Sequence, residues 1–262
     1  MRVWNWGSDV RITSCGITDV GMKRQRNEDN YLINDGIGLF VVADGMGGHA
    51  GGEYASQIAV TTVEEVMTNI RDERSPLDNN QATKDMLIQE KLKYAIRLAG
   101  KRIYQRAQDE SEYRGMGTTA LVLYMNRDLG YVAHVGDSRC YRVRGDTVAQ
   151  ITEDHSLVNE QIKAGLINRD AAKSHKLRNI ITRSLGYQEE VEIDTQVLPV
   201  EIGDYYLLCS DGLSNLVEDH EMADMLREFP FQEGTRKMVE LANKRGGDDN
   251  ITVVITRIDA LG

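Results

Sequence analysis

The chain has 262 residues, 41% of them hydrophobic, with 41 acidic against 31 basic residues. This is enough for a substantial hydrophobic core, and we predict a single domain over residues 1–262. The formal net charge of −10 argues against nucleic acid or an anionic membrane as the main partner. We find three cysteines without a CxxC pair and no apolar stretch of signal or membrane-spanning type. We therefore expect a cytoplasmic protein, and we expect it to be monomeric.

Strand-like alternation of apolar and polar residues recurs along the chain. The predicted strands cover residues 11–18, 30–34, 38–43, 118–125, 129–135, 140–144, 147–151, 192–198, 205–209 and 251–258. Helical periodicity appears over residues 55–66, 92–107, 219–228 and 232–244. Residues 71–85 are polar and are predicted to form an exposed connection between the first two helices. Antiparallel strands with helices in separate pairs predict an α+β layered sandwich rather than a doubly wound parallel sheet.

Residues 155–187 differ in charge from the rest of the chain. They contain six lysines and arginines against two acidic residues, and six minus two gives a local charge of +4. Helical patches at 157–164 and 168–173 fall between two groups of strands. A solvated pair of basic helices is the simpler interpretation. The alternative is a mobile flap beside a functional site.

Four aspartates stand where a strand-like run stops or starts beside glycine or a tight turn. Asp44, Asp137 and Asp211 follow such runs, whereas Asp249 precedes one. Antiparallel neighbours place the end of one strand beside the start of the next, so the four carboxylates can share one rim of a sheet. One Asp-Gly is usually a plain turn, but four acidic corners weaken that explanation. Clustered carboxylates favour a hard cation, Mn²⁺ or Mg²⁺, over metals that prefer His or Cys.

A short charged run lies upstream of the first corner. Arg24 comes just before Glu28 and Asp29. A planar guanidinium can bind two phosphate oxygens at once, which a lysine cannot do. Taken alone, residues 23–26 are more simply explained as an exposed basic run, and only their order relative to the aspartate corners favours a binding role.

Six segments in this order resemble motifs of the metal-dependent protein phosphatases of type 2C, in their bacterial form, which remove phosphate from serine and threonine. These segments are Arg24 with Asn27-Glu28-Asp29, then residues 42–53 (VADGMGGHAGGE), 117–120 (GTTA), 134–139 (HVGDSR), 209–213 (CSDGL) and 248–252 (DDNIT). The resemblance spans nearly the whole chain. It implies two packed antiparallel β-sheets flanked by helices on both sides, an α/β/β/α four-layer sandwich, with a small flap subdomain at about residues 155–187.

The same resemblance implies a binuclear Mn²⁺ or Mg²⁺ centre. Asp44 would bridge the two ions, Gly45 would offer its backbone carbonyl to the first, and Asp211 and Asp249 would hold the second. The catalytic residues would then be Asp44, Asp211 and Asp249. Asp137, together with Asp211, matches a third and weaker metal site of bacterial members.

The remaining matched positions would support this centre. Arg24 corresponds to the arginine that binds the substrate phosphate. Glu28 and Asp29 would act through ordered water, and Asn250 would support a neighbouring ligand or the substrate. The implied reaction is direct attack on phosphorus by a hydroxide that bridges the two metals, without a phosphoenzyme.

The proton donor for the leaving alkoxide is left unassigned. Animal members have a histidine directly after the Asp-Gly, but this chain has Met46 there. His49, three residues later, is not necessarily equivalent, and a metal-bound water could serve instead.

Two other functions stay open at this point. A pseudophosphatase would only bind phosphorylated proteins, but it would be expected to have lost a metal-binding acid, and this chain has all of them. A phosphatase dedicated to one regulatory phosphoprotein is the second. We favour a general protein phosphatase that counteracts a serine/threonine kinase and acts on phosphorylated proteins. In that case the basic flap could attract phosphorylated substrate through Lys173, Lys176 and Arg178.

Overall fold

The computed structural model describes residues 10–47, 51–68, 81–173 and 175–261. Within these ranges, none of the helices has the length and apolar character needed to cross a membrane. The prediction for His49 lies outside the described residues.

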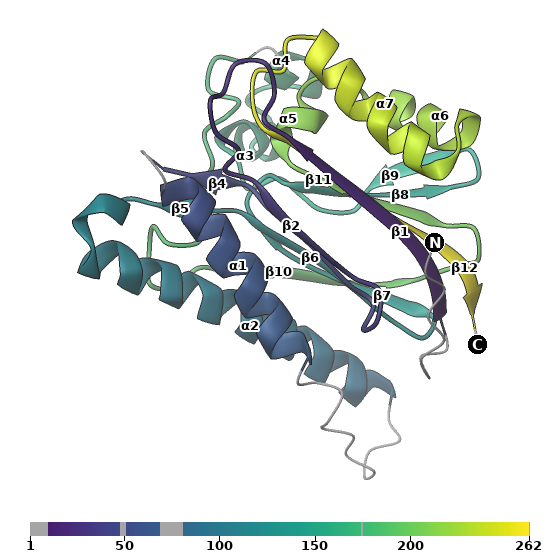
Figure 1. The fold of residues 1–262 in the computed structure, drawn as a ribbon, viewed down its shortest axis with the longest axis horizontal. Coiled ribbons are helices and arrows are strands. Elements are labelled where there is room, and N and C mark those ends of the chain that lie inside the picture. The colour runs from purple at the N-terminus through teal and green to yellow at the C-terminus, as the bar shows by residue number, and fades with distance from the viewer. Residues whose placement is uncertain (1–9, 48–50, 69–80, 174, 262) are drawn as a thin grey trace.

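Two five-stranded antiparallel sheets form the centre of the molecule (Figure 1). One sheet has the strand order β10-β7-β6-β3-β2 and the other has the order β1-β12-β11-β8-β9. The strands are β1 Val10–Asp19, β2 Asn30–Asn34, β3 Leu39–Ala43, β6 Ala120–Asn126, β7 Leu129–Val135, β8 Arg139–Arg144, β9 Thr147–Gln150, β10 Asp194–Pro199, β11 Tyr205–Cys209 and β12 Ile251–Leu261. The short strands β4 Gly45–Met46 and β5 Gly117–Thr118 form a separate pair.

Helices cover the outer face of each sheet (Figure 1). The long helices α1 Gly51–Thr68 and α2 Gln81–Asp109 pack on the first sheet, and α6 Asp219–Glu228 and α7 Phe231–Lys244 pack on the second. The remaining helices are α3 Leu157–Lys163, α4 Arg169–Lys173, α5 Asp211–Ser214 and the 3₁₀ turn Ser111–Tyr113. The predicted α/β/β/α arrangement is therefore confirmed.

The two-residue period of the strands explains the layers. In β3, Leu39 and Val41 belong to the core under α1 and α2, whereas Phe40 and Val42 belong to the core between the sheets. In β11, Leu207 packs toward α6 and α7, and Tyr206 faces the opposite sheet. Each central strand thus buries both faces.

Two predicted segments are wrong in detail. The predicted strand 118–125 is broken at Thr119, whose backbone and hydroxyl bond to Asp44 instead of continuing the ladder. The predicted connection 71–85 extends too far, because α2 already begins at Gln81. Asp211 follows the strand 205–209 as predicted, and it also opens the short helix α5 after Ser210.

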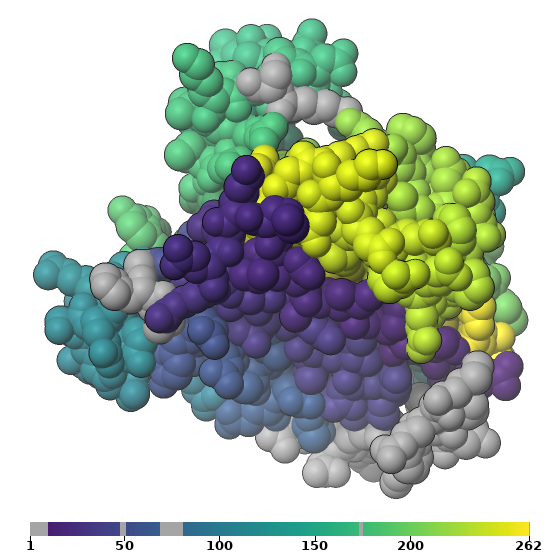
Figure 2. All heavy atoms as spheres, turned by 45° about the horizontal axis from the view of Figure 1, so that its top comes forward, coloured from purple at the N-terminus to yellow at the C-terminus, as the bar shows by residue number. Residues whose placement is uncertain are grey.

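Residues 155–187 leave the sandwich between β9 and β10. They contain α3 and α4, and Figure 2 shows the part around these helices as a lobe that stands out from the body. Within this segment Ser156 pairs with Ile181, and near its end Leu185 pairs with Thr118 of the body. That this segment is a separate subdomain, within a single domain of residues 1–262, stays a prediction.

Candidate metal centre

The four aspartate corners meet at one end of the sandwich, but they do not share the rim of one sheet. Asp44 follows β3 of the first sheet, whereas Asp211 and Asp249 flank β11 and β12 of the second. Asp137 lies in the connection from β7 to β8, where the chain crosses between the sheets. The prediction of a single rim is wrong, and the site is instead built from the facing ends of two sheets.

Backbone bonds fix the position of Asp44. Its N–H donates to the hydroxyl of Thr119 at 2.9 Å. Its carbonyl accepts from the Thr119 N–H and from the Thr118 hydroxyl, both at 2.9 Å. The Thr119 hydroxyl also bonds to that of Ser138, next to Asp137, at 2.8 Å. Thr119, where the predicted strand is interrupted, thus links the Asp44 and Asp137 corners through hydrogen bonds.

Asp29 is buried between the two sheets. One oxygen of its carboxylate accepts hydrogen bonds from the hydroxyls of Ser210 at 2.8 Å and Thr252 at 2.7 Å. Ser210 immediately precedes Asp211, and Thr252 closely follows Asp249. Thr119, Ser210 and Thr252 lie within the matched motifs, but their role could not be predicted, because only the fold shows which corners they connect.

Asn250 holds the loop that carries Arg24. Its side-chain oxygen accepts from the Glu28 N–H at 2.8 Å, and its amide donates to the carbonyls of Val20 and Arg26 at 2.9 Å. Arg24 Nη2 then reaches the Asp249 carboxylate at 2.7 Å. The structure therefore brings Arg24, Glu28 and Asn250 to the acidic corners and shows Asn250 bound to backbone groups.

The crowding of carboxylates raises their pKa values. Burial, followed by repulsion from Asp29, Asp211, Asp137 and Asp249, raises the pKa of Asp44 well above its ordinary value. Burial raises the pKa of Asp137 to about 8, with Asp211 adding to the shift. The pKa of Asp211 is raised to about 6, again by burial and then by Asp249. Such a group of acids ionises together only when cations compensate the charge.

Several features fit bound divalent cations. The Oε1 atom of Glu28 and the Oδ1 atom of Asp29 are buried without a hydrogen-bond partner among the described residues. A side chain at Gly45 is excluded, because a Cβ there would lie 2.1 Å from the Gly52 carbonyl and 2.4 Å from that of Glu28. Backbone carbonyls and carboxylates are oxygen donors, which Mg²⁺ and Mn²⁺ prefer.

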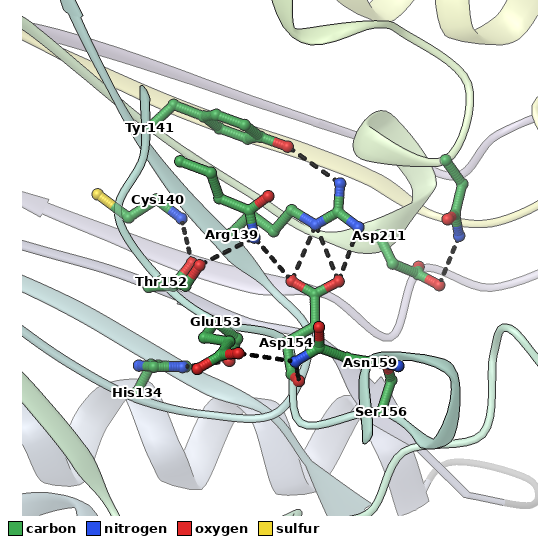
Figure 3. Close-up of polar contacts among 12 residues, drawn as sticks. His134, Arg139, Cys140, Tyr141, Thr152, Glu153, Asp154, Ser156, Asn159 and Asp211 are labelled. Atoms are coloured by element: carbon green, nitrogen blue, oxygen red, sulfur yellow. Dashed lines mark hydrogen bonds and ion pairs between the residues drawn. The ribbon is translucent and has the colours of Figure 1, made fainter. Parts of the chain in front are cut away.

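A partly buried arginine, Arg139, lies close to Asp211 (Figure 3). Arg139 makes a bidentate ion pair with Asp154, with Nη2 2.7 Å and Nε 3.0 Å from its oxygens, and Nη1 donates to the Tyr141 hydroxyl at 3.1 Å. Its positive charge opposes the rise in the pKa of both Asp137 and Asp211. Arg139 lies within a matched motif, but its partner Asp154 is 15 residues away and could not be identified from spacing.

A second group of ligand-type side chains, His134, His155 and Asp194, lies outside the acidic corners. His155 Nδ1 accepts from the Gly136 N–H at 3.1 Å, and its Nε2 lies 3.4 Å from the Asp194 carboxylate and 3.3 Å from Arg183 Nη1. Arg183 donates to the same carboxylate at 3.0 Å. Hydrogen bonds to Gly136, Glu153 and Arg183 thus already engage these side chains.

The acidic corners open into a cleft of about 640 Å³. It is lined by Arg24, Glu28, Asp44, Gly45, Asp137, Asp211 and Asp249, and on the other side by residues between 179 and 192. Met46 also lines the cleft, and no histidine does so in the described part of the chain. The proton donor therefore stays unassigned.

Comparisons with known proteins agree with this geometry. The family model for protein phosphatase 2C matches residues 22–254. Protein phosphatase PhpP of Streptococcus pneumoniae is 38% identical over 247 residues, which cover 93% of this chain and 96% of that protein. The structure of the serine/threonine phosphatase PstP/Ppp of Mycobacterium tuberculosis has a TM-score of 0.84 and 33% identity, and covers 95% of this chain and 99% of that one.

A structure of the catalytic domain of the phosphatase PstP in complex with two manganese ions is also similar. Its TM-score is 0.81 at 32% identity, over 95% of this chain and 98% of that chain. Sequence match and fold thus agree over nearly the full length. This chain belongs to the protein phosphatase 2C family and is a metal-dependent protein serine/threonine phosphatase.

Proposed function

We propose that the acidic corners hold two Mn²⁺ or Mg²⁺ ions and that the cleft hydrolyses phosphoserine and phosphothreonine in proteins. In this proposal Asp44 bridges the ions, Gly45 contributes its carbonyl, and Asp211 and Asp249 complete the second ion's ligands. Asp137 contributes to a third and weaker site. The observation that carries the proposal is the convergence of these groups and Arg24 on one cleft.

The chain's own residues would position and neutralise the substrate. When bound, the two cations would lower the pKa of a water that attacks phosphorus directly, without a phosphoenzyme. Arg24 bonds to Asp249 through one amino group, and a guanidinium has further N–H donors for phosphate oxygens. Asn250 would hold the Arg24 loop, and Asp29 would fix the distance between the sheets. Glu28 would act through ordered water.

The cellular role is part of the same proposal. We propose phosphorylated proteins as substrates and a serine/threonine kinase as the opposing enzyme, in a signalling role. The curated relatives carry the names protein phosphatase and serine/threonine phosphatase, which supports this substrate class. We also propose a cytoplasmic monomer, and the buried free thiols of Cys140 and Cys209 suit a reducing compartment.

The phosphoprotein-binding pseudophosphatase is disfavoured, because every acid of the proposed centre is present and lies at the cleft. The deciding experiment is phosphate release from a phosphothreonine peptide with Mn²⁺. We expect turnover that EDTA abolishes and added Mn²⁺ restores. Binding of the peptide without release of phosphate would favour the pseudophosphatase.

A further inference from the structure

The wall of the cleft opposite the aspartates is not basic. Among the lysines and arginines of residues 155–187 whose side chains the structure describes, only Arg183 lines the cleft. Its guanidinium is bonded to Asp194 at 3.0 Å and to Glu192 at 3.1 Å. The basic character that the sequence shows for this segment is therefore directed elsewhere in the described structure, and the cleft wall needs another explanation.

Apolar side chains are exposed on this wall. Tyr187 lines the cleft and keeps 76% of its surface exposed, and Ile180 lines it with 48% exposed. Large apolar groups exposed beside a functional cleft are typical of sites that contact a partner. An aromatic ring in particular offers a large contact area at a low cost in conformational entropy.

The backbone before Tyr187 is fixed to the core. Leu185 is fully buried and exchanges two hydrogen bonds with Thr118, at 3.1 and 2.9 Å. Gly186 has a φ of +91°, and a Cβ there would lie 2.4 Å from Ile103. Only glycine suits that conformation and contact. Tyr187 thus presents an exposed ring just after a stretch of backbone that is bonded to Thr118 of β5 through Leu185.

The charge of the same wall is acidic. Glu190 and Glu192 line the cleft together with Arg183, so acids outnumber bases there. Glu192 is already paired with Arg183, so Glu190 remains as the uncompensated negative charge on this wall. A peptide that extends from the phosphate site along this wall meets an apolar surface and a negative charge.

We propose that Tyr187 and Ile180 bind the polypeptide beside the phosphorylated residue, and that they select substrates with an apolar side chain near a lysine or arginine. This proposal rests on the proposed phosphatase function, because it assigns substrate recognition to the part of the cleft that a small phosphate ester does not reach. The occupant is a segment of a phosphorylated protein, held by contact with the ring and by attraction to Glu190.

The test compares two substrates with one set of variants. We expect Tyr187→Ala to raise KM for a phosphothreonine peptide with flanking leucine and lysine by about fivefold or more, in line with a typical aromatic contact. Its kinetics on p-nitrophenyl phosphate should stay within about twofold, because that ester needs only the metal centre. Replacement of the peptide's leucine by alanine should raise KM for the wild type but not for Tyr187→Ala.

Two controls separate this role from general damage. Tyr187→Phe keeps the ring and should behave as the wild type. Leu166→Ala removes an apolar side chain that is 73% exposed in the same segment but does not line the cleft, and it should have no effect.

Equal KM values for the wild type and Tyr187→Ala on the peptide would overturn the proposal. So would a larger effect from joint neutralisation of Lys173, Lys176 and Arg178, since that result would favour recognition by charge. A wild-type enzyme that hydrolyses neither substrate would instead refute the proposed function itself.

Discussion

The two walls of the cleft are built in different ways. The acidic wall consists of strand ends from two sheets, where Asp44 is bonded to Thr118 and Thr119 and Asp29 is bonded across the sandwich to Ser210 and Thr252. The opposite wall comes from a single excursion of the chain, residues 179–192, with an exposed tyrosine. Rigid sheet ends suit chemistry that depends on fixed charges, and an outlying segment suits contacts that differ between substrates. Substitutions in the acidic wall should therefore slow the hydrolysis of every substrate.

The largest effect is expected from Asp211→Asn. Loss of a carboxylate from the acidic wall should lower kcat on both peptide and small ester by about a thousandfold or more, as for removal of a major electrostatic element. The measurement is steady-state hydrolysis with saturating Mn²⁺, and circular dichroism should show an unchanged fold. Near-normal turnover by this variant would remove the metal centre from the proposed function.

A smaller loss is expected from Arg24→Ala. Because its guanidinium would bind the substrate phosphate, loss of Arg24 should lower kcat/KM by about a hundredfold. Arg24→Lys should restore only part of kcat/KM, because lysine cannot bind two phosphate oxygens at once. Lys23→Ala, a change at the adjacent exposed cation, is the matched control. Equal losses from Lys23 and Arg24 would mean that only general positive charge matters.

Asp137→Asn should have a moderate effect that depends on metal concentration. Because we assign Asp137 to the weaker site, its loss should raise the Mn²⁺ concentration for half-maximal activity by about tenfold, a typical cost of a changed ligand environment. Titration of activity with Mn²⁺ gives this value. An unchanged midpoint would exclude Asp137 from metal binding.

The smallest effect is on thermal stability and its dependence on pH. The folded-state pKa of Asp137 is raised from 3.8 to about 8, so its stability contribution without metal is full below pH 3.8 and is lost as the pH rises toward 8. A bound cation favours the ionised form. The increase in Tm on adding Mn²⁺ to chelated protein should therefore grow by about 4 °C between pH 5 and 8.

Differential scanning fluorimetry in EDTA and in Mn²⁺ measures this difference at each pH. In Asp137→Asn, the increase in Tm on adding Mn²⁺ should rise less steeply with pH. A Mn²⁺ effect that is independent of pH would contradict the coupling of metal binding to these carboxylates.

Local sequence determined much of the fold. Alternation in Leu39–Ala43 and Tyr205–Cys209 predicted buried strands, and the helical periods predicted α1, α2, α6 and α7. The order of the aspartate corners predicted an acidic site at strand ends. These features depend on neighbours within a few residues, so periodicity and turn chemistry are sufficient to find them.

Only the tertiary structure decided which corners meet and what they contact. The ion pair of Arg24 with Asp249 spans 225 positions, and the bond from Thr252 to Asp29 spans 223. The division of the acids between two sheets, and the placement of Tyr187 at the cleft, likewise follow from how the layers pack. Such contacts are set by the burial of both sheets in one core, and no local pattern records them.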